Sequence, residues 1–239
     1  MKLLTRLFIL FVLVAAFTGA VVLRGVWGRL RAVKTVYVTI PEGATVNDIN
    51  KKLTASGVLS SGEILPVSKE GYLFPDTYQF YVPSSPQVVE EKFMSNFDNK
   101  VTPLIPPKDD LKRIIIIASL IQDEAKTPGD MKLVSGVIWK RLTAGMPLQI
   151  DATVCYVKQK LPCLPITKAD LEINSPYNTY LNKGLPPGPI GNPGLDAINA
   201  AVNPEKSSYW YYISIPGSGK LVFAETLDEQ DRNIVKYLK

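Results

Sequence analysis

Hydrophobic positions change their spacing several times along the chain, and each spacing predicts a different element. Residues 33–40 alternate and are rich in β-branched side chains, which predicts a strand. Helical spacing follows between Thr45, which can cap a helix, and Gly57, which can end it. Another helix is expected over 86–99, with four residues facing inward. These are Val88, Val89, Phe93 and Phe97.

The middle of the chain predicts a buried helix followed by a partner helix. The first begins at Asp109 or Asp110, and apolar residues cover more than half of its circumference, which is typical of a buried helix. Its apolar residues are Leu111, Ile114, Ile115, Ile117, Ala118, Leu120 and Ile121. The segment 127–129 breaks this helix, and the partner is expected from about Asp130 to Ala144.

The remaining residues, 146–239, are rich in Pro, Gly, Asn and Tyr. They predict a short helix at 195–202, a strand pair around 209–225 and a C-terminal helix at 227–238. Between residues 70 and 82, aromatic residues recur with period two, which indicates core packing rather than a sugar-stacking platform. These are Tyr72, Phe74, Tyr78 and Phe80. The elements together predict an α+β fold.

Residues 7–23 form an uncharged apolar run that can cross roughly 26 Å of a bilayer as a helix. Basic residues stand on both sides, so the positive-inside rule orients the run only weakly. We favour an uncleaved membrane anchor over a signal peptide cut near residues 18–20, because the apolar run continues to Leu23. Either alternative places the remainder outside the cytoplasm, whereas a buried core helix is disfavoured because the run has no polar face.

Composition narrows the chemistry. The chain has 239 residues, a net charge of +5 and no histidine, which excludes Ser-His-Asp and Cys-His catalysis and every metal motif that needs histidine. The modest charge and the absence of a run of five basic residues argue against nucleic-acid binding. Cys155 and Cys163 stand eight positions apart, and both a disulfide and two unpaired thiols remain open.

Glu124 is the candidate for acid–base chemistry. It follows Ile117, Leu120 and Ile121 by seven, four and three positions, which places it on the apolar stripe near the C-terminal end of its helix. Loss of water and the negative end of the helix dipole both favour the protonated carboxyl, so its pKa is expected to rise. The alternative is a carboxylate neutralised by a nearby cation or turned into water. The candidate cations are Lys126, Lys140 and Arg141.

Three polar residues follow at alternating positions, namely Gln149, Asp151 and Thr153. The alternation predicts an extended segment over 149–153, in which these three residues share one face. Such a face suits sugar or peptide hydroxyls, and it equally suits a solvated edge strand.

Several motifs occur in the order seen in MltG-type (YceG-like) endolytic murein transglycosylases, and the sequence resembles that family over residues 36–239. The motifs are EGYLFPDTYQF (70–80), IIIIASLIQDEA (114–125), RLTAGMPLQIDATVCY (141–156), INSPYNTYLNKGLPPGPIGNPGLDAINAAVNP (173–204) and LVFAETLDEQDRN (221–233).

The resemblance implies an α+β protein with an N-terminal transmembrane helix, a small LysM-like strand–helix subdomain and a mixed α+β catalytic domain. The corresponding ranges are 1–6 for a cytoplasmic N-terminus, 7–23 for the anchor, 24–35 for a juxtamembrane linker, 36–69 for a truncated LysM-like subdomain and 70–239 for the catalytic domain.

The resemblance also assigns roles to residues, with Glu124 as the single catalytic acid and base. Substrate-binding roles fall on Gln149, Asp151, Thr153, Ser175, Tyr177, Asn178, Thr179 and Tyr180. Support of the cleft is expected from Glu70, Tyr72, Asp76 and Tyr78. The chain departs from the family at Gln122, where a second glutamate is common, and at Gln230, where a histidine is usual.

The implied activity is cleavage of the β-1,4 bond between MurNAc and GlcNAc in nascent peptidoglycan, leaving 1,6-anhydroMurNAc ends without a metal or organic cofactor. The expected partners are glycan strands, the cytoplasmic membrane and wall-synthesis or division proteins, but not nucleic acid. The expected location is the bacterial inner membrane, with one span and an extracytoplasmic catalytic domain. Asp151 or Asp76 remains open as the second carboxylate of a hydrolase. The alternative function is a non-catalytic peptidoglycan-binding or division-scaffold protein.

Overall fold

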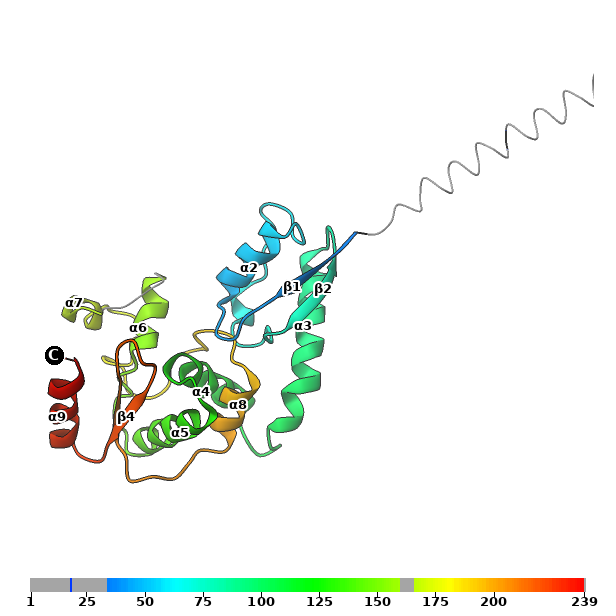
Figure 1. Ribbon diagram of the computed structural model, residues 1–239. Helices are drawn as coiled ribbons and strands as arrows, with labels where there is room; N and C mark the ends of the chain where they lie inside the picture. Colours follow the sequence, from blue (N-terminus) through cyan, green and yellow to red (C-terminus); the bar gives the residue numbers. More distant parts are fainter. Residues whose placement is uncertain (1–17, 19–33, 160–165, 239) are drawn as a thin grey trace, which may run out of the picture.

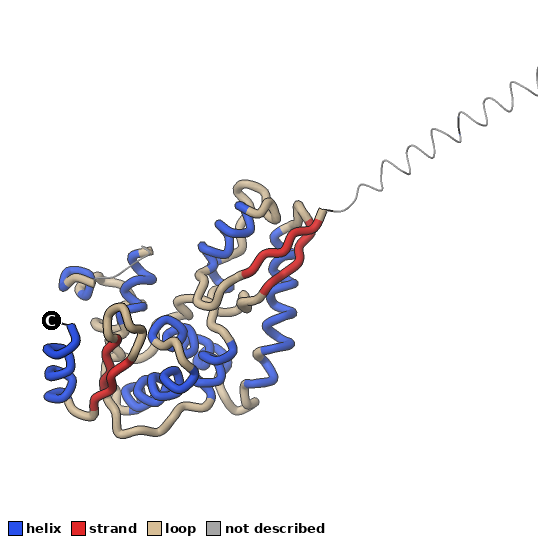
Figure 2. The backbone as a smooth tube through the Cα atoms, viewed as in Figure 1, coloured by secondary structure: helices blue, strands red, loops and turns tan. Residues whose placement is uncertain are grey.

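The computed structural model describes residues 18, 34–159 and 166–238, and it has a mixed α+β fold with two small sheets (Figures 1 and 2). The predicted α+β class is therefore confirmed. The predicted anchor at 7–23 lies outside the described residues, except for Thr18. Within the described ranges, no helix is long and apolar enough to cross a membrane.

The first hydrophobic core lies where two strands pack against two helices. Strand β1 (Thr35–Thr39) pairs antiparallel with β2 (Thr77–Tyr81), and α2 (Val46–Ala55) and α3 (Pro86–Lys100) contribute buried residues to the same cluster. The predicted cap is confirmed, because the Thr45 side chain accepts a hydrogen bond from the Asp48 backbone. Tyr78 and Phe80 lie in this core, as the core-packing interpretation predicts. Val88 is half exposed, so its predicted inward orientation was wrong.

The second core surrounds α4 (Leu111–Glu124), which Asp110 caps as predicted. Residues 114–121 are all buried, and α5 (Pro128–Thr143) and α8 (Leu195–Val202) pack against this helix. Helix α5 begins earlier than predicted because the Thr127 side chain caps it and Pro128 suits its first turn. The connecting 3-10 turns are η1 (Val67–Lys69) and η2 (Thr102–Leu104).

The C-terminal part places two short helices, a hairpin and a last helix beside the second core (Figure 1). These elements are α6 (Asp151–Lys158), α7 (Lys168–Leu171), β3 (Tyr211–Ser214), β4 (Leu221–Ala224) and α9 (Leu227–Leu238). The strand pair and the C-terminal helix confirm the predictions for 209–225 and 227–238.

The extended segment predicted at 149–153 was wrong. Ile150 is the N-cap of α6, so Asp151 stands in the first helical turn, where a negative charge is favourable. The backbone of Gln149 has a positive φ of 55°, which reverses the chain before the helix. An alternation of only three polar residues is too short to distinguish a strand from a turn followed by a helix.

Asn192 joins the two cores and has no exposed surface. Its side-chain oxygen accepts a hydrogen bond from the Leu73 backbone at 2.8 Å. Its amide nitrogen donates to Ala44 O at 2.8 Å and to Glu70 Oε1 at 3.0 Å. Asn192, in the loop before α8, is therefore hydrogen-bonded both to the chain before α2 and to the residues after η1.

Substitution of Gly136 should destabilise the protein, because the backbone of residue 205 lies against this position of α5. A Cβ atom on Gly136 would stand 2.0 Å from Glu205 O. We expect Gly136→Ala to cost about 1–3 kcal/mol of unfolding free energy, although alanine is the better helix former. Urea unfolding of the purified chain measures this loss. Gly129→Ala is the matched control in the same helix, because its nearest atom would be Thr127 Oγ1 at 4.0 Å, and an equal loss there would contradict the prediction.

Candidate functional site

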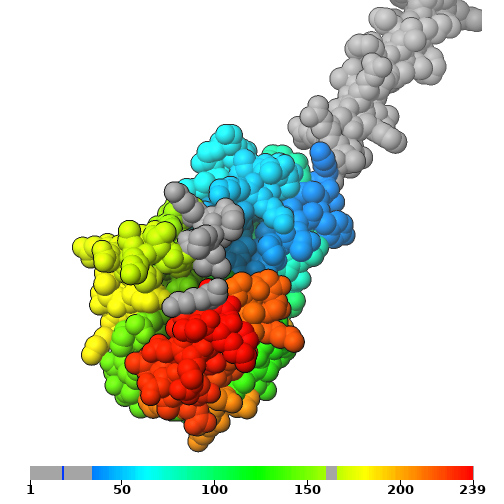
Figure 3. Space-filling view, turned by 60° about the vertical axis from the view of Figure 1, so that its left-hand side comes forward, coloured from blue at the N-terminus to red at the C-terminus, as the bar shows by residue number. Residues whose placement is uncertain are grey.

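A cleft of about 1520 Å³ lies between α2 and α6. The α2 wall is polar, and its residues include Thr45, Asn47, Asp48, Asn50, Lys51 and Thr54. The opposite wall is formed by α6 and the segment after α7, and its residues include Ala152, Cys155, Tyr156, Val157, Ser175 and Tyr177. In Figure 3, the surface around α2 (cyan) and the surface formed by residues near 170–180 (yellow-green) lie on the same face of the molecule. The volume exceeds that of a typical small-molecule pocket, which indicates an extended ligand.

Glu124 ends α4 beside this cleft, next to the lining residue Asp123. It keeps some exposed surface although protein atoms crowd its carboxyl group, as expected for a group at the edge of a cleft. Burial raises the pKa of Glu124 to about 7, and the negative charge of Asp151 acts in the same direction. Hydrogen bonds from the Tyr212 hydroxyl and the Ala152 backbone oppose this rise. The predicted upward direction is confirmed.

The cations proposed as neutralising partners of Glu124 bind elsewhere. Lys140 Nζ donates to Ser207 O at 3.0 Å, and Arg141 Nε donates to Trp210 O at 2.9 Å. Lys126 acts on Asp123, whose pKa burial raises to about 6 although much of that residue is exposed. Among the described residues, the ion pairs within 4.0 Å do not include Glu124.

The sequence analysis missed Tyr212 of β3, and it named Arg141 of α5 only as a cation that could neutralise Glu124, whereas Arg141 is buried and acts on Tyr212. The Tyr212 hydroxyl is hydrogen-bonded to Glu124, and burial raises its own pKa well above the usual value. Arg141 stacks on the Tyr211 ring with its guanidinium carbon 5.1 Å from the centroid. The sequence indicates a strand at this position, but nothing in it shows which helix end that strand meets.

The eight predicted substrate-binding residues divide into two groups. Ser175 and Tyr177 line the cleft, Gln149 and Asp151 are exposed, and Tyr180 is half-buried with its hydroxyl donating to Asp151.

The other three are buried and satisfied by protein partners. The hydroxyls of Thr153 and Thr179 lie 3.1 Å apart, and Asn178 donates to Leu171 O and Ile173 O. They join α6 to the segment after α7, so their position shapes the cleft without exposing them to a ligand.

Glu70 is a second carboxyl group whose pKa burial raises to about 7. Its oxygens accept from the Val46 backbone at 3.0 Å and from the Asn192 amide at 3.0 Å, and the Tyr156 hydroxyl is a further partner. The Tyr156 ring contacts Tyr177 with a centroid distance of 5.0 Å. Glu70 therefore stands behind both walls of the cleft and connects them.

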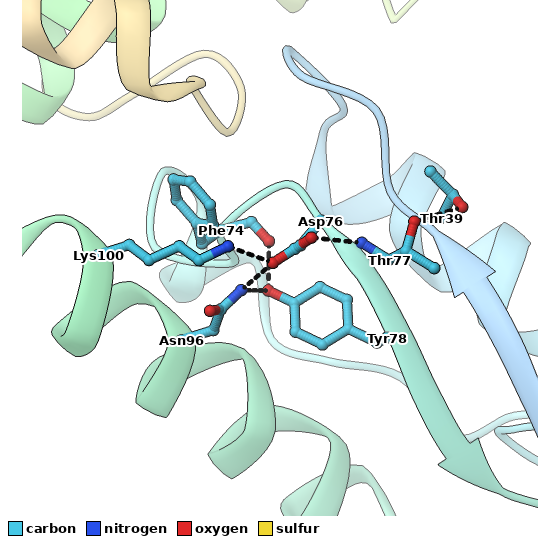
Figure 4. A network of polar contacts seen from close by, with 7 residues as sticks. All are labelled: Thr39, Phe74, Asp76, Thr77, Tyr78, Asn96 and Lys100. Carbon is cyan, nitrogen blue, oxygen red and sulfur yellow. Dashed lines mark hydrogen bonds and ion pairs between the residues drawn. The ribbon is translucent and has the colours of Figure 1, made fainter.

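Asp76, Tyr78 and Tyr72 lie away from the cleft. Figure 4 shows Asp76 next to Lys100, whose Nζ is 2.6 Å from Asp76 Oδ2, and next to Asn96. Tyr78 donates to Phe74 O in the same network, and the Tyr72 ring packs against Phe97 at 5.3 Å. These contacts brace β2 and α3, and none of the three residues is among those that line the cleft.

The surroundings of Gln122 favour a neutral amide over the carboxylate of a glutamate. Its side-chain oxygen accepts from the backbone of Gly194, the N-cap of α8, at 2.9 Å, and its nitrogen lies 3.4 Å from Glu42 Oε2. A glutamate at position 122 would bring a second carboxylate against Glu42, which the neutral amide avoids.

The disulfide that the sequence left open would pair Cys155 with Cys163, which lies outside the described residues, so that pairing is not tested. Cys155 lines the cleft. Over 34–159 and 166–238, no group of three or more His, Cys, Asp or Glu side chains is placed to hold a metal ion.

Comparison with known proteins identifies the family of this chain. The model of the YceG-like family matches residues 17–236. An endolytic murein transglycosylase of Bacillus subtilis (strain 168) is 37% identical over 174 residues, which is 71% of this chain and 48% of that protein. One from Streptococcus pneumoniae (strain D39) is 30% identical, over 84% of this chain and 44% of that protein. The chain thus spans about half the length of the curated relatives it matches. A crystal structure of a yceG-like protein from Listeria monocytogenes has a TM-score of 0.73 and 30% identity, covering 82% of this chain and 75% of that one.

Proposed function

This chain belongs to the YceG-like family, and from that premise we propose that it is a peptidoglycan lytic transglycosylase with Glu124 as its one catalytic acid and base. The curated relatives are named endolytic murein transglycosylases, which supports this class of activity. The observation that carries the proposal is the position of Glu124, a carboxyl group of raised pKa beside a cleft large enough for a glycan strand.

Two carboxyl groups in this part of the protein have a pKa near 7, and their surroundings separate their roles. Glu70 is 6% exposed and its oxygens are occupied by backbone and side-chain donors from three segments. Glu124 keeps exposed surface beside the cleft. Of these two groups, Glu124 is therefore the one with surface that a saccharide can contact, and a carboxyl group that is half protonated near neutral pH suits both proton donation and proton removal.

The proposed reaction uses Glu124 twice. In the first step, its proton passes to the glycosidic oxygen between MurNAc and GlcNAc, and the bond from that oxygen to C1 breaks. In the second step, the Glu124 carboxylate removes the proton of the MurNAc 6-hydroxyl, whose oxygen bonds to C1 and closes the 1,6-anhydro ring. Because the substrate supplies the nucleophile, a second carboxylate is unnecessary, in contrast to most glycosidases.

The cleft residues fit a sugar polymer. Tyr156 and Tyr177 offer aromatic faces on one wall, and α2 offers amide and hydroxyl groups on the other. The cleft is lined from Asp123 and Ala152, next to Glu124, to residues along α2, so we propose that it binds sugar units beyond the scissile bond, as cleavage within a strand requires. The exposed Gln149 and the half-buried Tyr180 are proposed as further sugar contacts near Glu124.

The test is the chemistry of the new chain end. Purified uncrosslinked glycan strands incubated with the full-length chain in ¹⁸O water should give 1,6-anhydroMurNAc ends that carry no label, because water does not enter the reaction. Mass spectrometry of the digested products measures this. Labelled reducing ends would indicate a hydrolase that uses Asp151 as the second carboxylate, and binding without cleavage would indicate the wall-binding or scaffold alternative.

We also propose that residues 7–23 anchor the protein in the cytoplasmic membrane, with the described part on the outer side. The apolar run at those positions supports this. Fractionation of cells, followed by protease treatment of spheroplasts, should find the chain in the membrane fraction and the C-terminal part accessible from outside. Recovery as a soluble intracellular protein would contradict the anchor.

A further inference from the structure

Strand β3 belongs to a sheet that needs outside support. It pairs with β4, and the two strands form a two-stranded sheet of four-residue strands. A two-stranded hairpin is only marginally stable on its own. Helix α9 packs against both strands (Figure 1), although it has no fully buried residue. The support that α9 gives to β3 must therefore come from a few individual contacts and not from a buried apolar face.

Gln230 makes one of these contacts. Its Nε2 donates to the Tyr212 backbone carbonyl at 3.1 Å. Its Oε1 is buried without a hydrogen-bond partner among the described residues. An unsatisfied buried oxygen is unfavourable for stability. The hydrogen bond that Nε2 donates is therefore the favourable contact that the structure shows for this amide.

Tyr212 connects this contact to the reaction site. Its backbone carbonyl is held by α9, and its hydroxyl is hydrogen-bonded to the Glu124 carboxyl group. Both contacts belong to one residue in the middle of a short strand, so a shift of the strand would move the hydroxyl.

We propose that Gln230 is a positioning residue for the transglycosylase reaction, because its amide fixes the Tyr212 backbone and thereby keeps the Tyr212 hydroxyl against Glu124. The inference rests on the proposed function of Glu124. It assigns the C-terminal helix a role in the site although no residue of α9 is among those that line the cleft.

The position of the Tyr212 hydroxyl has a measurable electrostatic consequence. Titratable or charged groups of α4, α5, α6, β3 and the segment after α7 lie near Glu124 or near its direct neighbours. They are Asp123, Arg141, Asp151, Tyr212 and Tyr180. Of these, the Tyr212 hydrogen bond favours the carboxylate, so its loss should raise the Glu124 pKa further above about 7. Since Glu124 must first donate a proton, the basic limb of kcat/KM follows this pKa and should move to higher pH.

The experiment compares Gln230→Met, Tyr212→Phe and the double variant in the full-length chain, with uncrosslinked glycan strands as substrate and anhydro ends as the readout. Methionine keeps the size of the side chain and removes the donor. We expect Tyr212→Phe to move the basic limb up by roughly one pH unit, and Gln230→Met to move it in the same direction by less. The double variant should move it no further than Tyr212→Phe alone, because Gln230 acts through Tyr212.

Gln87→Met, on the exposed face of α3, is the matched control and should leave the limb unchanged. Two results would overturn the proposal. In the first, Gln230→Met lowers the rate but does not displace the basic limb of kcat/KM. In the second, the displacements of the two single variants add in the double variant, and either result would show that Gln230 has a merely structural role. If Gln230→Met does not fold, Gln230→Leu replaces it, and failure of both to fold would also overturn it. Failure of the proposed function is a different result, because the unmodified chain would then release no anhydro ends.

Discussion

Glu124→Gln is expected to lower the formation of 1,6-anhydroMurNAc ends by on the order of 10³-fold, while the protein stays folded. Glutamine has the shape of the glutamic acid side chain and can still accept hydrogen bonds from Tyr212 and Ala152, so the packing at the end of α4 should persist. It can neither donate a proton to the glycosidic oxygen nor remove one from the 6-hydroxyl. Both steps of the reaction therefore fail together.

The measurement is mass spectrometry of glycan strands digested by the purified full-length variant, with thermal unfolding recorded on the same preparation. Glu91→Gln makes the same chemical change on the exposed surface of α3 and should keep the wild-type rate. Undiminished anhydro ends from Glu124→Gln would refute the assignment. A lowered melting temperature would show instead that the variant reports on folding.

Asn192→Asp should be the most destabilising single substitution outside the hydrophobic cores. The amide nitrogen now donates to Ala44 O and Glu70 Oε1, and a carboxylate at this position would face both acceptors without a proton to donate. Because the site is fully buried, we expect a loss of about 3 kcal/mol or more. Thermal unfolding should show it as a clearly lowered melting temperature.

A second substitution should restore part of that loss. In Glu70→Gln/Asn192→Asp, the glutamine can accept from the Val46 backbone and donate to the new carboxylate, so the pair exchanges donor and acceptor. The double variant should therefore be more stable than Asn192→Asp alone. If the two losses simply add, the bond between Glu70 and Asn192 is not what connects the two parts of the fold.

Regular helices were predictable in this chain because their signals are local. The apolar residues of α4 recur at helical spacing, and Asp110 and Thr45 are cap residues beside the helices that they begin. The same spacing placed Glu124 on the buried stripe, from which the direction of its pKa shift followed.

Local signals were insufficient around Gln149 and Asp151. The alternation there predicted an extended face, whereas the Thr153–Thr179 contact and the positive φ of Gln149 produce a turn and a helix. The family resemblance pointed to the region but could not separate Thr153 and Asn178, which are buried, from Ser175 and Tyr177, which line the cleft. Exposure depends on partners distant in sequence.

The amino-acid order alone was enough to identify the helices, the buried stripe and a carboxyl group that loses water, since each depends on residues within a few turns of one another. Folding in three dimensions was needed to bring Asp151 and Tyr212 to Glu124, to occupy Glu70 with donors from three segments and to connect Gln230 to the site through β3. The physical reason is that burial and charge act through space, and the groups that set the Glu124 pKa come from elements that no local pattern relates to one another.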